Sequence, residues 1–133
     1  MLRPLALAAT LSAATAALGA CAPEAEVPDG RKPAYEGVQT VLLEGDLVSF
    51  SLAMTGARGN ADVEAYGRCA AAQYALDRGY GFARQVRTIV TKEGRNWYGD
   101  AVYLVSAALP QGLRTIDAEV TVAECGELGI PTV

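Results

Sequence analysis

An alanine-rich segment without proline in the middle of the chain, residues 61–78, is the feature that most limits how this chain can fold. Alanine has the highest helix propensity, so the segment predicts a helix that ends at Gly79. Four strand-like segments surround it, at residues 47–54, 82–91, 98–107 and 115–122. The sequence therefore predicts a two-layer α+β domain of order β-α-β-β-β, with one helix on one face of an antiparallel sheet of about four strands.

The alternation of apolar and polar side chains is clearest in the last of these segments. Ile116, Ala118, Val120 and Val122 alternate there with residues that are all polar or charged. A strand with this pattern has one face in water, so we expect the sheet to be covered on one side only. The polar residues 92–97 include a glycine and are typical of a hairpin connection between the two middle strands.

Two cysteines within this domain form a second constraint. Ala65, Cys69, Ala72 and Leu76 are spaced by three or four residues, and we expect this stripe of the helix to face the sheet. Cys125 follows the last strand-like segment. In an exported protein the pair predicts a Cys69–Cys125 disulfide, with two separate buried thiols as the alternative.

The amino-terminal segment indicates that the chain is exported. Arg3 precedes sixteen uncharged residues that are rich in alanine and too mildly apolar for a typical spanning helix. Leu18, two small residues and Cys21 then resemble the bacterial lipobox, in which the cysteine thiol accepts a diacylglyceryl group. The alternatives are an ordinary signal cleaved after Ala20 and a helix that is not cleaved.

The lipobox divides the chain into three parts. Residues 1–20 are expected to be a signal peptide, residues 21–37 a lipidated Cys21 followed by a flexible, proline-containing tether, and residues 38–133 a single domain. An alternative for the tether is a loop packed on the domain through Tyr35. In such lipoproteins an aspartate after the cysteine favours the inner membrane, so Ala22 indicates the outer membrane, facing the periplasm.

Composition excludes several functional classes. The chain contains no histidine, which removes histidine-based triads and metal sites, and we expect no cofactor or metal. Its net charge of −4 is unfavourable for nucleic-acid binding. Ser49 and Ser51 have no histidine partner for nucleophilic catalysis.

Two clusters of charged residues have a functional and a structural interpretation. Asp117, Glu119 and Glu124 are compatible with a glycosidase pair, or with a solvated strand face. The basic residues of the middle strands could bind a phosphate or form an ordinary charged edge; they are Arg84, Arg87, Lys92 and Arg95. Arg84 and Arg87 are three positions apart, so regular alternation places them on opposite faces.

The segment CAAAQYALDRGYGFAR, together with the lipobox and the later cysteine, resembles a set of small uncharacterised bacterial envelope lipoproteins. The resemblance supplies no catalytic residue. We therefore predict an envelope-anchored lipoprotein that is not an enzyme, attached to the membrane by lipid and binding an unknown envelope protein or component. The alternatives are a small-ligand or lipid-binding periplasmic module and a hydrolase that uses the acidic strand face.

Overall fold

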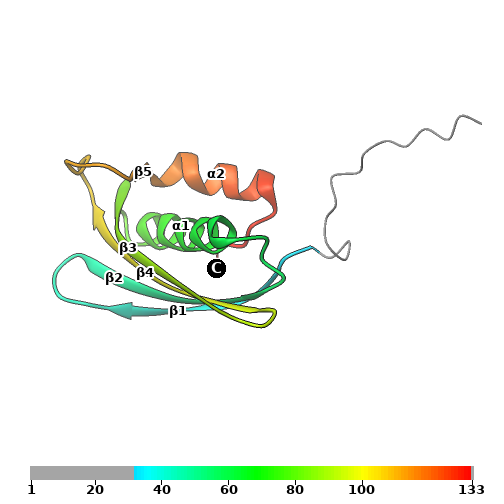
Figure 1. The fold of residues 1–133 in the computed structure, drawn as a ribbon. Coiled ribbons are helices and arrows are strands. Elements are labelled where there is room, and N and C mark those ends of the chain that lie inside the picture. Colours follow the sequence, from blue (N-terminus) through cyan, green and yellow to red (C-terminus); the bar gives the residue numbers. More distant parts are fainter. Residues whose placement is uncertain (1–31, 133) are drawn as a thin grey trace, which may run out of the picture. The chain divides into compact units, whose positions relative to one another are not determined.

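The computed structural model describes residues 32–132, so Cys21 and most of the predicted tether lie outside the described residues. These residues form an α+β fold with five strands and two helices (Figure 1). The elements are β1 (Ala34–Leu42), β2 (Leu47–Thr55), α1 (Asn60–Asp77), β3 (Phe82–Glu93), β4 (Asn96–Ser106), β5 (Thr115–Asp117) and α2 (Ala118–Leu128). The α+β class is as predicted. The prediction of four strands and one helix missed one strand and one helix.

All neighbouring strands are antiparallel, and their order in the sheet is β1-β2-β4-β3-β5. The hairpins β1–β2 and β3–β4 meet through the pairing of β2 with β4, while α1 connects them in the sequence. The β3–β4 hairpin confirms the predicted connection, with a turn at Gly94 and Arg95.

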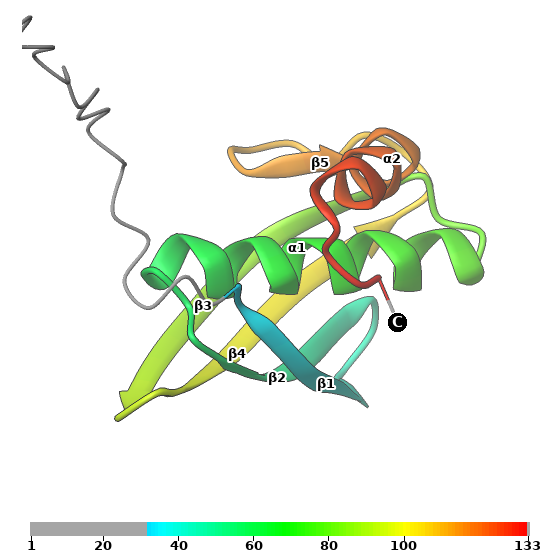
Figure 2. The same cartoon turned by 90° about the vertical axis from the view of Figure 1, so that its right-hand side faces the viewer.

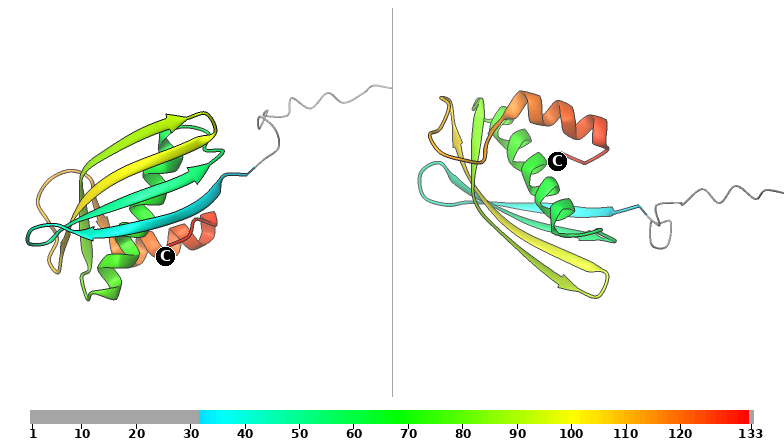
Figure 3. Two further views of the ribbon diagram at one scale, coloured as in Figure 1. Left: turned by 90° about the horizontal axis from the view of Figure 1, so that it is seen from below. Right: turned by 45° about the horizontal axis from the view of Figure 1, so that its top comes forward.

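Both helices lie on the same side of the sheet (Figures 1 and 2). Helix α1 contacts β2, β3 and β4, and α2 contacts α1 and β5, so α1 lies between the sheet and α2. Viewed from the other side, the strands are in front and α1 crosses behind them (Figure 3). Within residues 32–132, neither helix covers this second face of the sheet.

The predicted alternation in β2 is confirmed and builds the core. Val48, Phe50, Leu52 and Met54 are each at most 2% exposed and point toward α1. The ring of Phe50 makes edge contacts with Tyr74 of α1 and Tyr103 of β4. Burying four such side chains contributes roughly 6–12 kcal/mol of hydrophobic free energy before the entropic cost of folding.

Most of the buried residues of helix α1 are small, and the helix is covered on two sides. Gly67 lies so close to the sheet that an added Cβ would be 3.1 Å from Ala101 Cβ and from Leu52 Cδ1. Cys69, two residues later and about 200° around the helix, faces α2 instead. The expectation that the Cys69 stripe packs on the sheet is therefore wrong, because the opposite side of α1 does so.

The last predicted strand is mostly a helix. Only residues 115–117 pair with β3, and α2 starts at Ala118. Asp117 caps the helix, because its Oδ1 accepts a hydrogen bond from the Val120 N–H at 3.1 Å. Ala118, Thr121 and Cys125 are buried and share one side of a helix. Gly129, with φ of +70°, ends the helix.

Strand β1 was not predicted, and it moves the domain boundary. The sheet begins at Ala34, so the last four residues assigned to the tether belong to β1. The Tyr35 ring packs edge-on against Tyr66 of α1, with ring centroids 4.8 Å apart. A bulge between Tyr35 and Gly37 shifts the register with β2, and Gly37 has a φ of +133°, which favours glycine.

Candidate functional site

A disulfide joins the two helices. Cys69 of α1 and Cys125 of α2 are bonded, with their Cα atoms 6.0 Å apart and 56 positions apart in the sequence. Both residues are at most 2% exposed. The pairing is the one that the sequence indicates, but Cys125 belongs to a helix and not to the end of a strand.

The sheet face that α1 does not cover presents a mixed apolar and polar surface, which we call the open face. The register assigns to it residues that alternate with the core positions: Val41, Ser49, Ser51, Ala53, Arg87, Ile89, Tyr98, Asp100 and Val102. Val41, Ile89 and Tyr98 are large apolar or aromatic residues and are 51%, 48% and 42% exposed. Exposed apolar side chains that share one face are typical of interaction surfaces.

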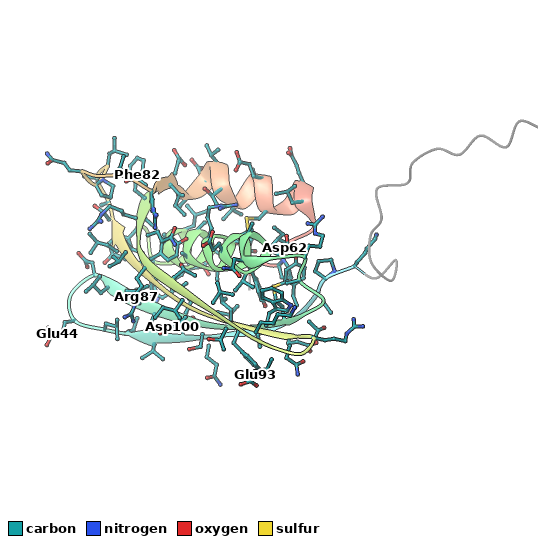
Figure 4. All side chains as sticks on the ribbon, viewed as in Figure 1. Glu44, Asp62, Phe82, Arg87, Glu93 and Asp100 are labelled. Atoms are coloured by element: carbon teal, nitrogen blue, oxygen red, sulfur yellow. A yellow bond between two sulfur atoms is a disulfide. The ribbon has the colours of Figure 1, made fainter. Side chains whose placement is uncertain are left out.

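Three polar side chains that contact one another lie on the open face. The Ser49 hydroxyl donates a hydrogen bond to Asp100 Oδ1 at 3.0 Å, and the Arg87 guanidinium lies 3.6 Å from Asp100 Oδ2 (Figure 4). The side chains of Arg87 and Asp100 are about half exposed, so the ion pair contributes at most about 1 kcal/mol. Its main effect is to hold three side chains of adjacent strands in place.

The predicted basic cluster is divided between two faces. A bulge between Gln85 and Arg87 inserts an extra residue, so Arg84 pairs with Leu104 and Arg87 with Val102. Leu104 and Val102 are two positions apart, which places both arginines on the same face. The prediction of opposite faces is wrong because a bulge shifts the strand alternation by one residue.

The other two basic residues of this cluster lie elsewhere. The Lys92 ammonium lies 5.1 Å from the centre of the Trp97 ring, on the side of the sheet that carries the core. Arg95 is in the β3–β4 turn, where its carbonyl accepts a hydrogen bond from the Gly56 N–H. The four residues therefore do not form a single phosphate-sized site.

The acidic residues do not share a strand face as predicted. Asp117 caps α2, and Glu119 and Glu124 lie on that helix, where they are exposed. Among residues 32–132, no group of three cysteine, aspartate or glutamate side chains is arranged to hold a metal ion.

A groove lies between the turn after α1 and the start of α2. It has a volume of about 350 Å³, at the lower end of the range for small-molecule sites. Its lining residues are Leu76, Gly79, Tyr80, Gly81, Phe82, Asp117 and Glu119. The groove combines an apolar and aromatic wall with two carboxyl groups, one of which already caps a helix.

The pKa values of Asp62 and Tyr103 depart clearly from their ordinary values, for two different reasons. The Arg58 guanidinium donates two hydrogen bonds of 3.0 Å to Asp62 at the start of α1, and it lowers the pKa of that carboxyl. Burial in the core raises the pKa of Tyr103 to about 12. Both effects are structural, since Asp62 fixes the start of α1 and Tyr103 packs on Phe50.

The outer edge of β1 is a feature that the sequence analysis missed. Val41, Leu42 and Leu43 are consecutive and 51%, 59% and 44% exposed. The residues of β1 alternate poorly because most of them are exposed, so its sequence carries no clear period of two. The uncharged run from residue 37 to residue 43 is the signal that could have revealed it.

None of the helices in residues 32–132 is both long enough and apolar enough to span a bilayer.

Comparisons with known proteins identify the domain but not an activity. The model of the family described as YNQ4 C-terminal domain matches residues 35–129, from β1 to the end of α2. A Paracoccus denitrificans protein titled "Uncharacterized 26.9 kDa protein in nqo8 5'region" is 34% identical over 77 residues, which are 56% of this chain and 30% of that protein. This chain thus aligns with less than a third of that relative. No solved structure matches.

Proposed function

This chain belongs to the YNQ4 C-terminal domain family, and we propose that it is a lipid-anchored, non-enzymatic binding module of the bacterial cell envelope. In this proposal Cys21 carries the lipid anchor in the outer membrane and the domain faces the periplasm, where it binds an envelope protein or component through its sheet.

The Leu18–Cys21 motif and the disulfide support the envelope location. Disulfides persist in oxidising compartments such as the periplasm, and Cys69 and Cys125 are joined in the core of this domain. A thiol at Cys21 remains for lipidation.

The open face is the observation that carries the binding function. Val41, Ile89 and Tyr98 are exposed on a side of the sheet that neither helix of residues 32–132 covers. A partner that covered them would remove apolar surface from water, which favours association by about 25 cal/mol per Å² before the costs of binding.

Metabolic labelling with a palmitate analogue tests the anchor. We expect label in the parent chain and none in the Cys21→Ala variant, which should leave the membrane fraction. The Ala22→Asp variant is the matched control: it should keep the label and move to the inner membrane. Equal labelling of the parent chain and Cys21→Ala would contradict the anchor.

Purification from crosslinked envelopes tests the binding surface. We expect one reproducible protein to copurify with the parent chain and to be lost from a variant with Ile89→Lys and Tyr98→Lys. Val120→Lys is the control, since Val120 is 55% exposed on α2 and lies outside the open face. A partner retained by the open-face variant and lost from Val120→Lys would refute this location.

The groove beside Tyr80 favours one alternative, a small-ligand or lipid-binding module. Native mass spectrometry of protein purified from envelopes distinguishes the two. A bound small molecule that is lost in Tyr80→Ala, without a crosslinked protein partner, would favour the alternative over the proposed function.

A further inference from the structure

The sheet has two long strands with a free edge, and these edges differ in how they resist pairing. Beyond Arg84, the outer edge of β3 has no partner strand within residues 32–132, because β5 pairs only with residues 82–84. The outer edge of β1 likewise has none there. Free edges offer backbone N–H and C=O groups to another strand unless charges, bulges or proline prevent it.

The free part of β3 carries such protection. The bulge between Gln85 and Arg87 interrupts its regular backbone. Arg87, Lys92 and Glu93 add charges along the same stretch, and Glu93 lies at the tip of the hairpin (Figure 4). A strand that docked there would meet an irregular backbone and three charged side chains.

Residues 37–43, which we call the β1 edge, are open to pairing. They include no charged residue and no proline, and Val41, Leu42 and Leu43 are about half exposed. Val41 and Leu42 point to opposite faces of the sheet, so an added strand could cover both with its own alternating side chains. The bulge in β1 lies between Tyr35 and Gly37 at the start of this segment, and the register with β2 is regular from Gly37 to Leu42.

The charged residues that directly flank the β1 edge in the sequence are negative, and the nearest basic residue before it is Lys32. Glu36 precedes it, and Glu44 and Asp46 follow it in the turn to β2. Glu44 points outward from the tip of that turn (Figure 4). From residue 33 to residue 46 the chain has these three acidic residues and no basic one.

These observations identify the kind of partner. We propose that the β1 edge binds an extended segment of a partner protein, which adds to the sheet as a sixth strand and has an apolar centre with lysine or arginine at its ends. Backbone hydrogen bonds supply the affinity in this mode of recognition, and side-chain positions supply the specificity. The basic ends of the segment would lie near Glu36 and Glu44.

A second copy of this chain fits the same edge poorly. In the antiparallel register that pairs residues 37–43 with their own copy, Glu36 of each copy lies opposite Glu44 of the other. Like charges directly opposite each other destabilise strand pairing. The charge pattern therefore favours a partner with basic ends over self-association.

Fluorescently labelled peptides test this inference with the full chain purified in detergent. The probe has five alternating valine and threonine residues with two lysines at each end. We expect it to bind at least tenfold more tightly than the same peptide with glutamate ends, and to protect residues 37–43 from hydrogen exchange. A lysine-ended peptide with a glycine and serine centre is the control for charge alone, and it should bind at least tenfold more weakly.

Protein variants locate the site. Glu36→Gln with Glu44→Gln should reduce the preference for lysine ends to threefold or less, whereas Glu93→Gln on the β3 hairpin should leave it unchanged. Equal binding of the peptides, protection elsewhere, or a dimer that forms through residues 37–43 would overturn the proposal.

This inference rests on the proposed binding function but can fail separately. If the peptides fail to bind at the β1 edge while Cys21 is still labelled and the partner still depends on Ile89 and Tyr98, only the inference about the β1 edge is refuted.

Discussion

Replacing Gly99 by alanine tests how closely α1 approaches the sheet. Gly99 lies in β4, directly opposite Leu52 of β2 and beneath Val63 of α1. A Cβ at this position would be 2.7 Å from Val63 Cγ1 and 3.0 Å from Leu52 Cδ1. Both distances are shorter than carbon atoms normally allow, so at least one neighbour has to move.

The two neighbours differ in how easily they can move. Leu52 meets the new atom with the end of a flexible side chain. Val63 meets it with a methyl group on its own Cβ, and a β-branched side chain in a helix has one strongly preferred rotamer. Val63 is also 0% exposed, so the backbone of α1 has to shift. We expect Gly99→Ala to lower the free energy of unfolding by about 1–3 kcal/mol, the usual cost of overpacking a core.

A double-mutant cycle separates this contact from a general effect of the substitution. Val63→Ala alone should cost about 2 kcal/mol, because two buried methyl groups are lost and a small cavity remains. In the double variant the new Cβ at position 99 occupies part of that space. The combined loss should therefore be smaller than the sum of the two single losses by at least about 1 kcal/mol.

Urea unfolding followed by fluorescence measures all three variants. Trp97 is the single tryptophan of the chain and is 9% exposed, so its emission reports on the core. Gly126→Ala is the matched control, because no atom lies within 4 Å of an added Cβ there. It should stabilise α2 by roughly 0.5–1 kcal/mol. Losses that add to within about 0.5 kcal/mol would refute the close contact between Val63 and Gly99.

Two further predictions concern the core. Replacing Cys69 and Cys125 together by alanine should lower the free energy of unfolding by about 4 kcal/mol, because the bond no longer reduces the entropy of the unfolded chain. The melting temperature should therefore fall by well over 10 °C. An unchanged melting temperature would contradict this prediction. Burial raises the pKa of Tyr103 to about 12, so the folded state keeps a proton that the unfolded state loses above pH 10. Stability from this group is complete below about pH 10 and falls by roughly 2–3 kcal/mol as the pH rises to about 12. Tyr103→Phe should remove that part of the decline in unfolding measurements, and an unchanged pH profile would contradict the assignment.

The sequence correctly predicted the elements in which one physical requirement, burial or helix propensity, determines the pattern of residue types. In β2 every second side chain enters the core, so its alternation is regular. The alanine-rich α1 contains no proline and many strong helix formers, and it ends before Gly79, which has a φ of +82°. The order of the sheet did not follow from these patterns, because it depends on how the two hairpins pair across α1.

Helix α2 shows why a periodic pattern can mislead. Ile116, Ala118, Val120 and Val122 satisfy a period of two, but Ala118, Thr121 and Cys125 satisfy the helical spacing as well. The caps decide between them: the Asp117 side chain binds the Val120 N–H, and Gly129 adopts a left-handed conformation. A helix start at aspartate and a stop at glycine were the signals that the sequence offered.

The candidate interaction surface could be predicted only in part. The charge-free run of the β1 edge is visible in the sequence, but β1 itself has little apolar alternation because it is an edge strand. The arrangement of Arg84 and Arg87 on one face depends on a bulge, which sequence periodicity does not show. The Cys69–Cys125 pairing followed from the number of cysteines and the expected compartment.

The position of α2 outside α1 makes the domain's resistance to proteolysis depend on oxidation. Helix α2 rests on α1 and β5 and lies away from the β2–β4 pairing at the centre of the sheet. In a reduced chain it is the unit expected to open first, in a partial unfolding that leaves the hairpins paired. Such an opening exposes the alanine-rich side of α1, so we expect proteases to cleave chains without the bond between Cys69 and Cys125 faster than chains that have formed it.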